Sequence, residues 1–201
     1  MFNVQDQIAA LQKLAQGTFS AEGQAMDWTY YDRLLLAAAG TSFTMFQNPL
    51  GSGAVPRTLA DTNMTTAGII PTNQNFTVFA IIVGYEAHAQ LASATIDILN
   101  NWLRTVTVSL TINGKAPTFQ KPLTEILGIP MLIHNEPAVT VSGVMGSQGR
   151  FTGISPLNIP ITLAANSNFN VIVEYPAAIG AVAIVADYLR IGLNGALIRA
   201  S

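Results

Sequence analysis

The chain has 201 residues, half of them hydrophobic and only 10% charged, with a formal net charge of −2 and no cysteine. The lack of cysteine excludes disulfides and thiolate chemistry, and the nine basic residues are scattered along the chain without the cluster typical of nucleic-acid binding. Because an ordinary soluble domain carries roughly 25% charged residues, we expect a surface covered by neighbouring subunits, with an extracellular monomer of neutral polar surface as the alternative.

Residues 1–17 have the apolar spacing of an amphipathic helix, with Asn3 in the position of an N-cap and Gly17 at its end. We interpret residues 1–32 as an arm that either packs on its own domain or reaches a neighbouring subunit. The N-terminus lacks the pattern of a secretory signal, and no apolar stretch reaches the ~20 residues of a transmembrane helix. We therefore expect synthesis and folding in a cytoplasm.

From residue 33 onward the pattern favours short strands. Strands are expected over 34–46, 76–83, 105–112, 139–144, 159–163, 169–175 and 182–193. Residues 76–83 are apolar on both faces, which predicts a central strand. A turn-rich connection spans 48–74, a helix is expected over 88–102, and Asn113-Gly114 signals a type I′ turn.

These ranges belong to a set of about eight strands, for which two sheets of four are the simplest arrangement, and the chain length suits one domain of that kind. We predict an all-β fold, a single jelly roll of two four-stranded antiparallel sheets over residues 33–201. It carries the N-terminal helical arm over residues 1–32 and one inserted helix. An immunoglobulin-like sandwich or a short barrel is the alternative.

No catalytic constellation emerges from the sequence. No serine lies in the G-x-S-x-G frame of a hydrolase, and Gly114-Lys115 belongs to a turn rather than to a phosphate loop. The two histidines, His88 and His134, lack the H-x-H spacing of a metal-binding jelly roll, although a site that joins both to Glu136 is conceivable. The eleven carboxylates are dispersed, so a glycosidase pair can form only through folding. We predict no catalytic, cofactor-binding or metal-ligating residue and no enzyme activity.

Several sequence blocks, taken in order, resemble a known family. They are Asp61-Thr62-Asn63-Met64, Gly68-Ile69-Ile70-Pro71, Phe76-Thr77-Val78, Leu110-Thr111-Ile112-Asn113-Gly114-Lys115 and Lys121-Pro122-Leu123. In this order a connecting loop enters a buried strand, a helix follows, and a threonine-rich strand ends in a hairpin. The layout, from about residue 33 to 195, resembles jelly-roll virion proteins of tailless or small bacteriophages.

The resemblance implies a capsid subunit that builds a viral shell through lateral β-domain and arm contacts. Its partners are then copies of itself and other virion proteins, and its location is the virion, assembled in the host cytoplasm. Because Lys13 is the only basic residue before position 33, we do not expect the arm to condense the genome.

Two other classes of function remain open. A vertex or fibre jelly roll that binds a host receptor or carbohydrate would use exposed aromatic side chains, for which Trp28, Tyr30, Tyr31 and Tyr85 are candidates, although core packing explains the same residues. The third class is an enzyme with a carboxylate pair assembled by folding.

Overall fold

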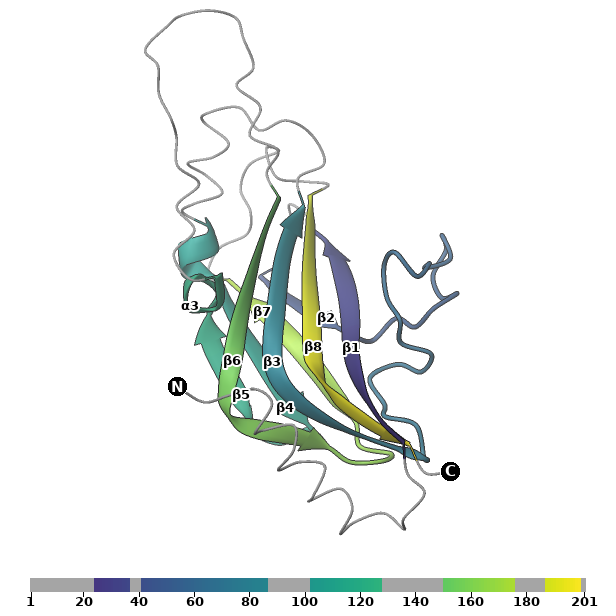
Figure 1. Ribbon diagram of the computed structural model, residues 1–201. Coiled ribbons are helices and arrows are strands. Elements are labelled where there is room, and N and C mark those ends of the chain that lie inside the picture. The colour runs from purple at the N-terminus through teal and green to yellow at the C-terminus, as the bar shows by residue number, and fades with distance from the viewer. Residues whose placement is uncertain (1–23, 37–40, 87–101, 128–149, 176–186, 200–201) are drawn as a thin grey trace, which may run out of the picture.

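The computed structural model describes residues 24–36, 41–86, 102–127, 150–175 and 187–199. In these residues eight strands form two antiparallel sheets of four strands each, which lie face to face (Figure 1). The expectation of an all-β fold with two four-stranded antiparallel sheets is therefore confirmed.

Each sheet has a defined strand order. The first sheet contains, in order, β1 (Gln24–Leu35), β8 (Tyr188–Arg199), β3 (Gln74–Glu86) and β6 (Arg150–Leu163). The second contains β2 (Ser42–Met45), β7 (Phe169–Glu174), β4 (Thr107–Ile112) and β5 (Phe119–Pro122). A short helix, α3 (Leu123–Leu127), follows β5, and residues 102–105 form a helical turn before β4.

The strand pairs are nested along the chain. β4 pairs with β5, β3 with β6, β2 with β7 and β1 with β8. In addition, β8 pairs with β3 and β7 pairs with β4. Consecutive strands alternate between the sheets except at β4 and β5, which are neighbours in one sheet. Each of the first four strands is therefore paired with one of the last four, in reverse order along the chain.

The core lies between the sheets and follows the period-two pattern of the strands. In and beside β4, Val106, Val108 and Leu110 are fully buried, as the alternation predicts. Ser109, on the opposite face, is also buried, because its small side chain lies between larger neighbours on β5 and β7. β3 is buried along most of its length and has a strand on each side, so its predicted central position is confirmed.

Two strands begin earlier than the sequence suggests. β1 starts at Gln24 and not near residue 33, because its backbone pairs along its whole length with β8. β6 begins at Arg150 and runs through Pro156 and Pro160, whereas the sequence predicts a strand only over 159–163. β6 is an edge strand, and an edge tolerates prolines because half of its amide groups need no partner strand.

The run 34–46 is not one strand, since β1 ends at Leu35 and β2 begins at Ser42. The last predicted strand also shifts, and β8 continues to Arg199. The predicted helix over 1–17, most of the helix over 88–102 and the strand over 139–144 lie outside the described residues. The division into an arm and a β-domain therefore stays a prediction. In the described part of the chain, no helix has the length and apolar character needed to cross a membrane.

Candidate interaction site

The connection between β2 and β3, residues 46–73, lies along the free edge of β1 (Figure 1). Tyr31 N donates to Asn63 Oδ1 at 2.9 Å, and Asn63 Nδ2 donates to Thr29 O at 2.7 Å. The Thr62 hydroxyl donates to Tyr31 O at 3.0 Å. These bonds occupy backbone groups of Thr29 and Tyr31 that an edge strand otherwise presents to another chain. We call residues 46–73 the edge loop.

A buried ion pair fastens the edge loop to β1. Asp32 is only 2% exposed, and Arg57 Nη2 lies 2.6 Å from its Oδ1. The other carboxylate oxygen accepts the Phe46 N–H, and Arg57 Nη2 also donates to Arg33 O at 2.7 Å. A buried carboxylate without a partner is costly, so these contacts hold the start and the middle of the loop to the strand.

Asp32 on β1 and Asp61 in the edge loop contribute to the free energy of unfolding with opposite dependence on pH. Burial raises the pKa of Asp32 above 3.8, although the Phe46 N–H and the Arg57 guanidinium oppose the rise. Its contribution to the free energy of unfolding therefore increases as the pH falls from the raised pKa toward 3.8. The Thr58 N–H lowers the pKa of Asp61 below 3.8, so that contribution is lost as the pH falls below 3.8.

Arg33 extends the network across the first sheet. Its guanidinium lies 3.6 Å from the Asp61 carboxylate and 3.2 Å from the Glu86 carboxylate, and it stacks 3.4 Å from the centroid of the Tyr188 ring. Strands β1, β3 and β8 are thus joined to the edge loop by one cation.

The outer part of the edge loop is apolar. Val55 is 84% exposed, Leu59 65% and Leu50 42%. The only charged residues of the loop, Arg57 and Asp61, are engaged in the contacts described above. The loop therefore presents neutral surface on a backbone fixed to the sheet, and we call Leu50, Val55 and Leu59 the apolar apex.

The backbone of the loop has bonds of its own. Gly51 N donates to Arg57 O at 2.9 Å, and Arg57 N donates to Ser52 O at 3.0 Å. Leu50 N donates at 2.8 Å to Met64 O, and the Met64 side chain is buried in the core. The apex is consequently held by hydrogen bonds and core packing rather than by the ion pair alone.

The four candidate aromatic residues have different surroundings. Tyr30 is buried, and Tyr85 is fully buried and donates its hydroxyl to Asp187. Trp28 is partly buried and packs against the core. Tyr31 points outward from β1, so it alone of the four combines partial exposure with a place in a surface groove.

The other candidate sites from the sequence are only partly visible. His88, His134 and Glu136 lie outside the described residues, and within those residues no three potential metal ligands gather. The predicted type I′ turn is confirmed by the positive φ angles of 53° at Asn113 and 66° at Gly114. Sequence analysis missed the Asp32–Arg57 pair, since no local pattern links residues so far apart.

No model of a known protein family matches the chain, and no curated protein sequence matches it.

Proposed function

We propose that this protein is a jelly-roll structural subunit of a bacteriophage-like virion that assembles with copies of itself into a shell. The observation that carries the proposal is the fixed, charge-free apolar apex on a β-domain with nested strand pairing. A self-assembling subunit needs surface of this kind, because large exposed apolar side chains on a rigid loop are stabilised when a neighbour covers them.

The strand order supports the jelly-roll part of the proposal. A jelly roll contains eight strands in two sheets and two Greek keys, and nested pairing of the first strand with the last, the second with the seventh and so on produces that arrangement. Viral capsid and lectin domains both use this architecture, so the fold by itself does not choose between shell and binder.

Composition and the closed edge favour the shell. With 10% charged residues, the chain has little of the charged surface that keeps a monomer soluble. The edge loop occupies β1 backbone groups at Thr29 and Tyr31, so a neighbour that approaches this part of β1 would meet loop side chains instead of adding a strand. Lateral contacts between loops and sheet faces suit a closed symmetric assembly.

The second candidate, a vertex or fibre protein that binds a receptor or carbohydrate, is favoured by Tyr31, which borders a groove on the outer face of the first sheet. We propose no enzyme activity, since the buried carboxylates of Asp32 and Asp187 have partners of their own.

Electron microscopy and mass determination of the purified full chain test the shell. We expect uniform particles or sheets from the wild type, and small species from Val55→Asp and Leu59→Asp with unchanged thermal unfolding. Asn158→Asp, an exposed change on β6 at the opposite edge of the sheet, is the control and should assemble normally. A monomeric wild type, or apex variants that assemble as well as the control, would contradict the proposal.

A further inference from the structure

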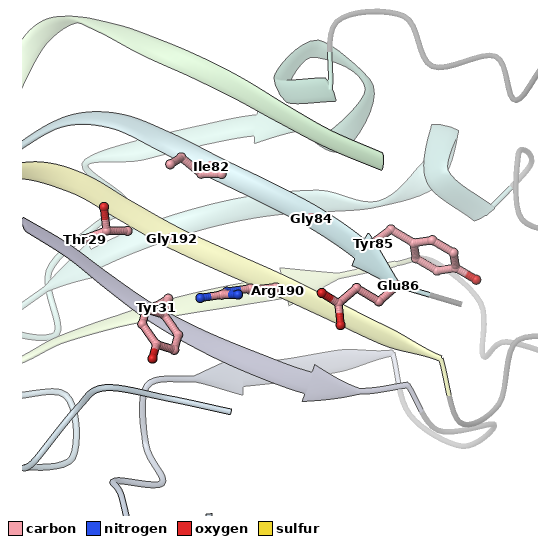
Figure 2. Close-up of a pocket in the computed structure, with 8 residues that line it drawn as sticks. All are labelled: Thr29, Tyr31, Ile82, Gly84, Tyr85, Glu86, Arg190 and Gly192. Atoms are coloured by element: carbon pink, nitrogen blue, oxygen red, sulfur yellow. The ribbon is translucent and has the colours of Figure 1, made fainter. Parts of the chain in front are cut away.

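The outer face of the first sheet contains a groove of about 370 Å³. It crosses three strands, with Thr29 and Tyr31 from β1, Arg190 and Gly192 from β8, and Gly84 and Glu86 from β3 (Figure 2). The volume is at the small end of the range for ligand pockets, roughly 300–1,000 Å³.

Strand register explains the groove. Tyr31 pairs with Gly192, and Arg190 pairs with Gly84, so each long outward side chain has a glycine beside it. A Cβ atom on Gly192 would lie 3.1 Å from Thr29 Cγ2 and 3.4 Å from the Cβ of Ile82. The side chains of Thr29 and Ile82 therefore lie close to Gly192, and the groove extends from there toward Gly84 and Arg190.

The groove contains a cation without a carboxylate partner among the described residues. The Arg190 guanidinium lies 4.1 Å from the centroid of the Tyr31 ring, and the structure gives it no ion pair in the described part of the chain. Glu86, the carboxylate of the groove, is engaged by Arg33 at 3.2 Å. Tyr31 donates its hydroxyl to Leu59 O, which fixes the ring beneath the guanidinium.

We propose that this groove binds an acidic monosaccharide unit, with its carboxylate on Arg190. A guanidinium presents paired N–H donors that match a carboxylate, and a stacked guanidinium is already oriented for that contact. The Thr29 hydroxyl, which accepts a hydrogen bond from Asn194 Nδ2 at 2.9 Å, can donate to a sugar oxygen, and the Ile82 side chain provides apolar surface for the ring. The groove lies on the sheet face and not on the apolar apex, so the inference goes beyond the proposed shell and is independent of it.

Calorimetric titration of the full chain with glucuronate, glucose and inorganic phosphate tests the groove. We expect glucuronate to bind at least about tenfold more tightly than glucose or phosphate, a difference of about 1.4 kcal/mol. Glucose matches the ring without the carboxylate, and phosphate tests for a general anion site.

Two variants connect the binding to the groove. Arg190→Gln removes the charge and Gly84→Val fills the floor, and each should weaken glucuronate binding at least about tenfold with thermal unfolding as a check of the fold. Arg104→Gln, a change at an exposed arginine in the helical turn at 102–105, should bind as the wild type does. The proposal is overturned if glucuronate fails to bind, if glucose or phosphate binds equally well, or if Arg190→Gln has no effect.

Discussion

At Gly195 the backbones of β8 and β3 approach so closely that no side chain fits. A Cβ atom there would lie 1.9 Å from Thr77 O and 3.0 Å from Val78 Cα. β3 shifts register between Val78 and Ala80, so this contact lies at an irregular point of the central strand pair. Backbone atoms in the middle of a sheet cannot move aside as a side chain can.

We expect Gly195→Ala to lower the free energy of unfolding by about 3 kcal/mol or more in urea titration. At Gly192, on the same strand, the two nearest atoms are side-chain atoms at 3.1 and 3.4 Å and the backbone Tyr30 O is 3.9 Å away, so Gly192→Ala should cost about 1 kcal/mol or less. Equal stability of the two variants would contradict this expectation, because it would mean that β8 and β3 move apart at Gly195 at little cost in free energy.

Three buried tyrosines make stability depend on alkaline pH. Burial raises the pKa of Tyr30, Tyr85 and Tyr175 above 10.0, and the nearby Asp187 carboxylate raises that of Tyr85 further. The unfolded chain releases these protons first, so the contribution of these tyrosines to the free energy of unfolding should be constant below pH 10 and fall above it. Urea titrations over a pH series measure this fall.

Tyr175→Phe and Tyr85→Phe separate the two kinds of buried hydroxyl. The Tyr175 hydroxyl has no hydrogen-bond partner among the described residues, so its removal should be neutral or stabilise by up to about 1 kcal/mol. Tyr85→Phe leaves the buried Asp187 carboxylate without that donor and should cost about 1–3 kcal/mol. Each variant should also reduce the loss of stability above pH 10. A reversed order of stabilities would contradict this account.

At the scale of elements, one buried charge pair contributes to the position of the edge loop. Arg57 joins Asp32, the backbone of Arg33 and the backbone of Asp61. We expect Arg57→Ala to destabilise the protein by about 3–5 kcal/mol, because Asp32 stays buried without its cation. The same change should speed thermolysin cleavage within residues 46–73.

Arg104→Ala is the matched control for the loss of an arginine, since Arg104 is exposed and forms no ion pair among the described residues. It should melt and resist protease as the wild type does. If Arg57→Ala does the same, the hydrogen bonds of Asn63 and Thr62 hold the loop without the ion pair.

At the scale of the whole molecule, the strand pairs that the structure describes in both sheets lie between Gln24 and Arg199. We expect deletion of residues 1–17 to leave the β-sheet circular dichroism spectrum and a cooperative thermal transition, but to impair particle formation in electron microscopy. An unfolded deletion variant would assign the predicted helix to the core of its own domain. Normal particles would remove the arm from the assembly contacts.

Sequence reasoning succeeded where the signal is local. The alternation in β4 identified its core face, and the apolar run of β3 identified a central strand, because burial on one or both faces repeats directly along a strand. It failed at β1, most of which the sequence assigns to an arm over residues 1–32, and at β6, of which the sequence predicts only 159–163. In both places the partner strand and the position in the sheet, rather than local propensity, decide the structure.

The sequence by itself determined the all-β class, the turn at Asn113-Gly114 and the scarcity of charge. Strand periodicity and φ preference depend on residues that are neighbours in the chain, and composition is a property of the whole chain. Only the tertiary structure decided that Asp32 meets Arg57 and that Tyr31 and Arg190 border one groove. Those partners come together through the antiparallel pairing of β1 with β8 and the return of the edge loop to β1. Contacts between such distant residues depend on strand order and register, which a single sequence does not record.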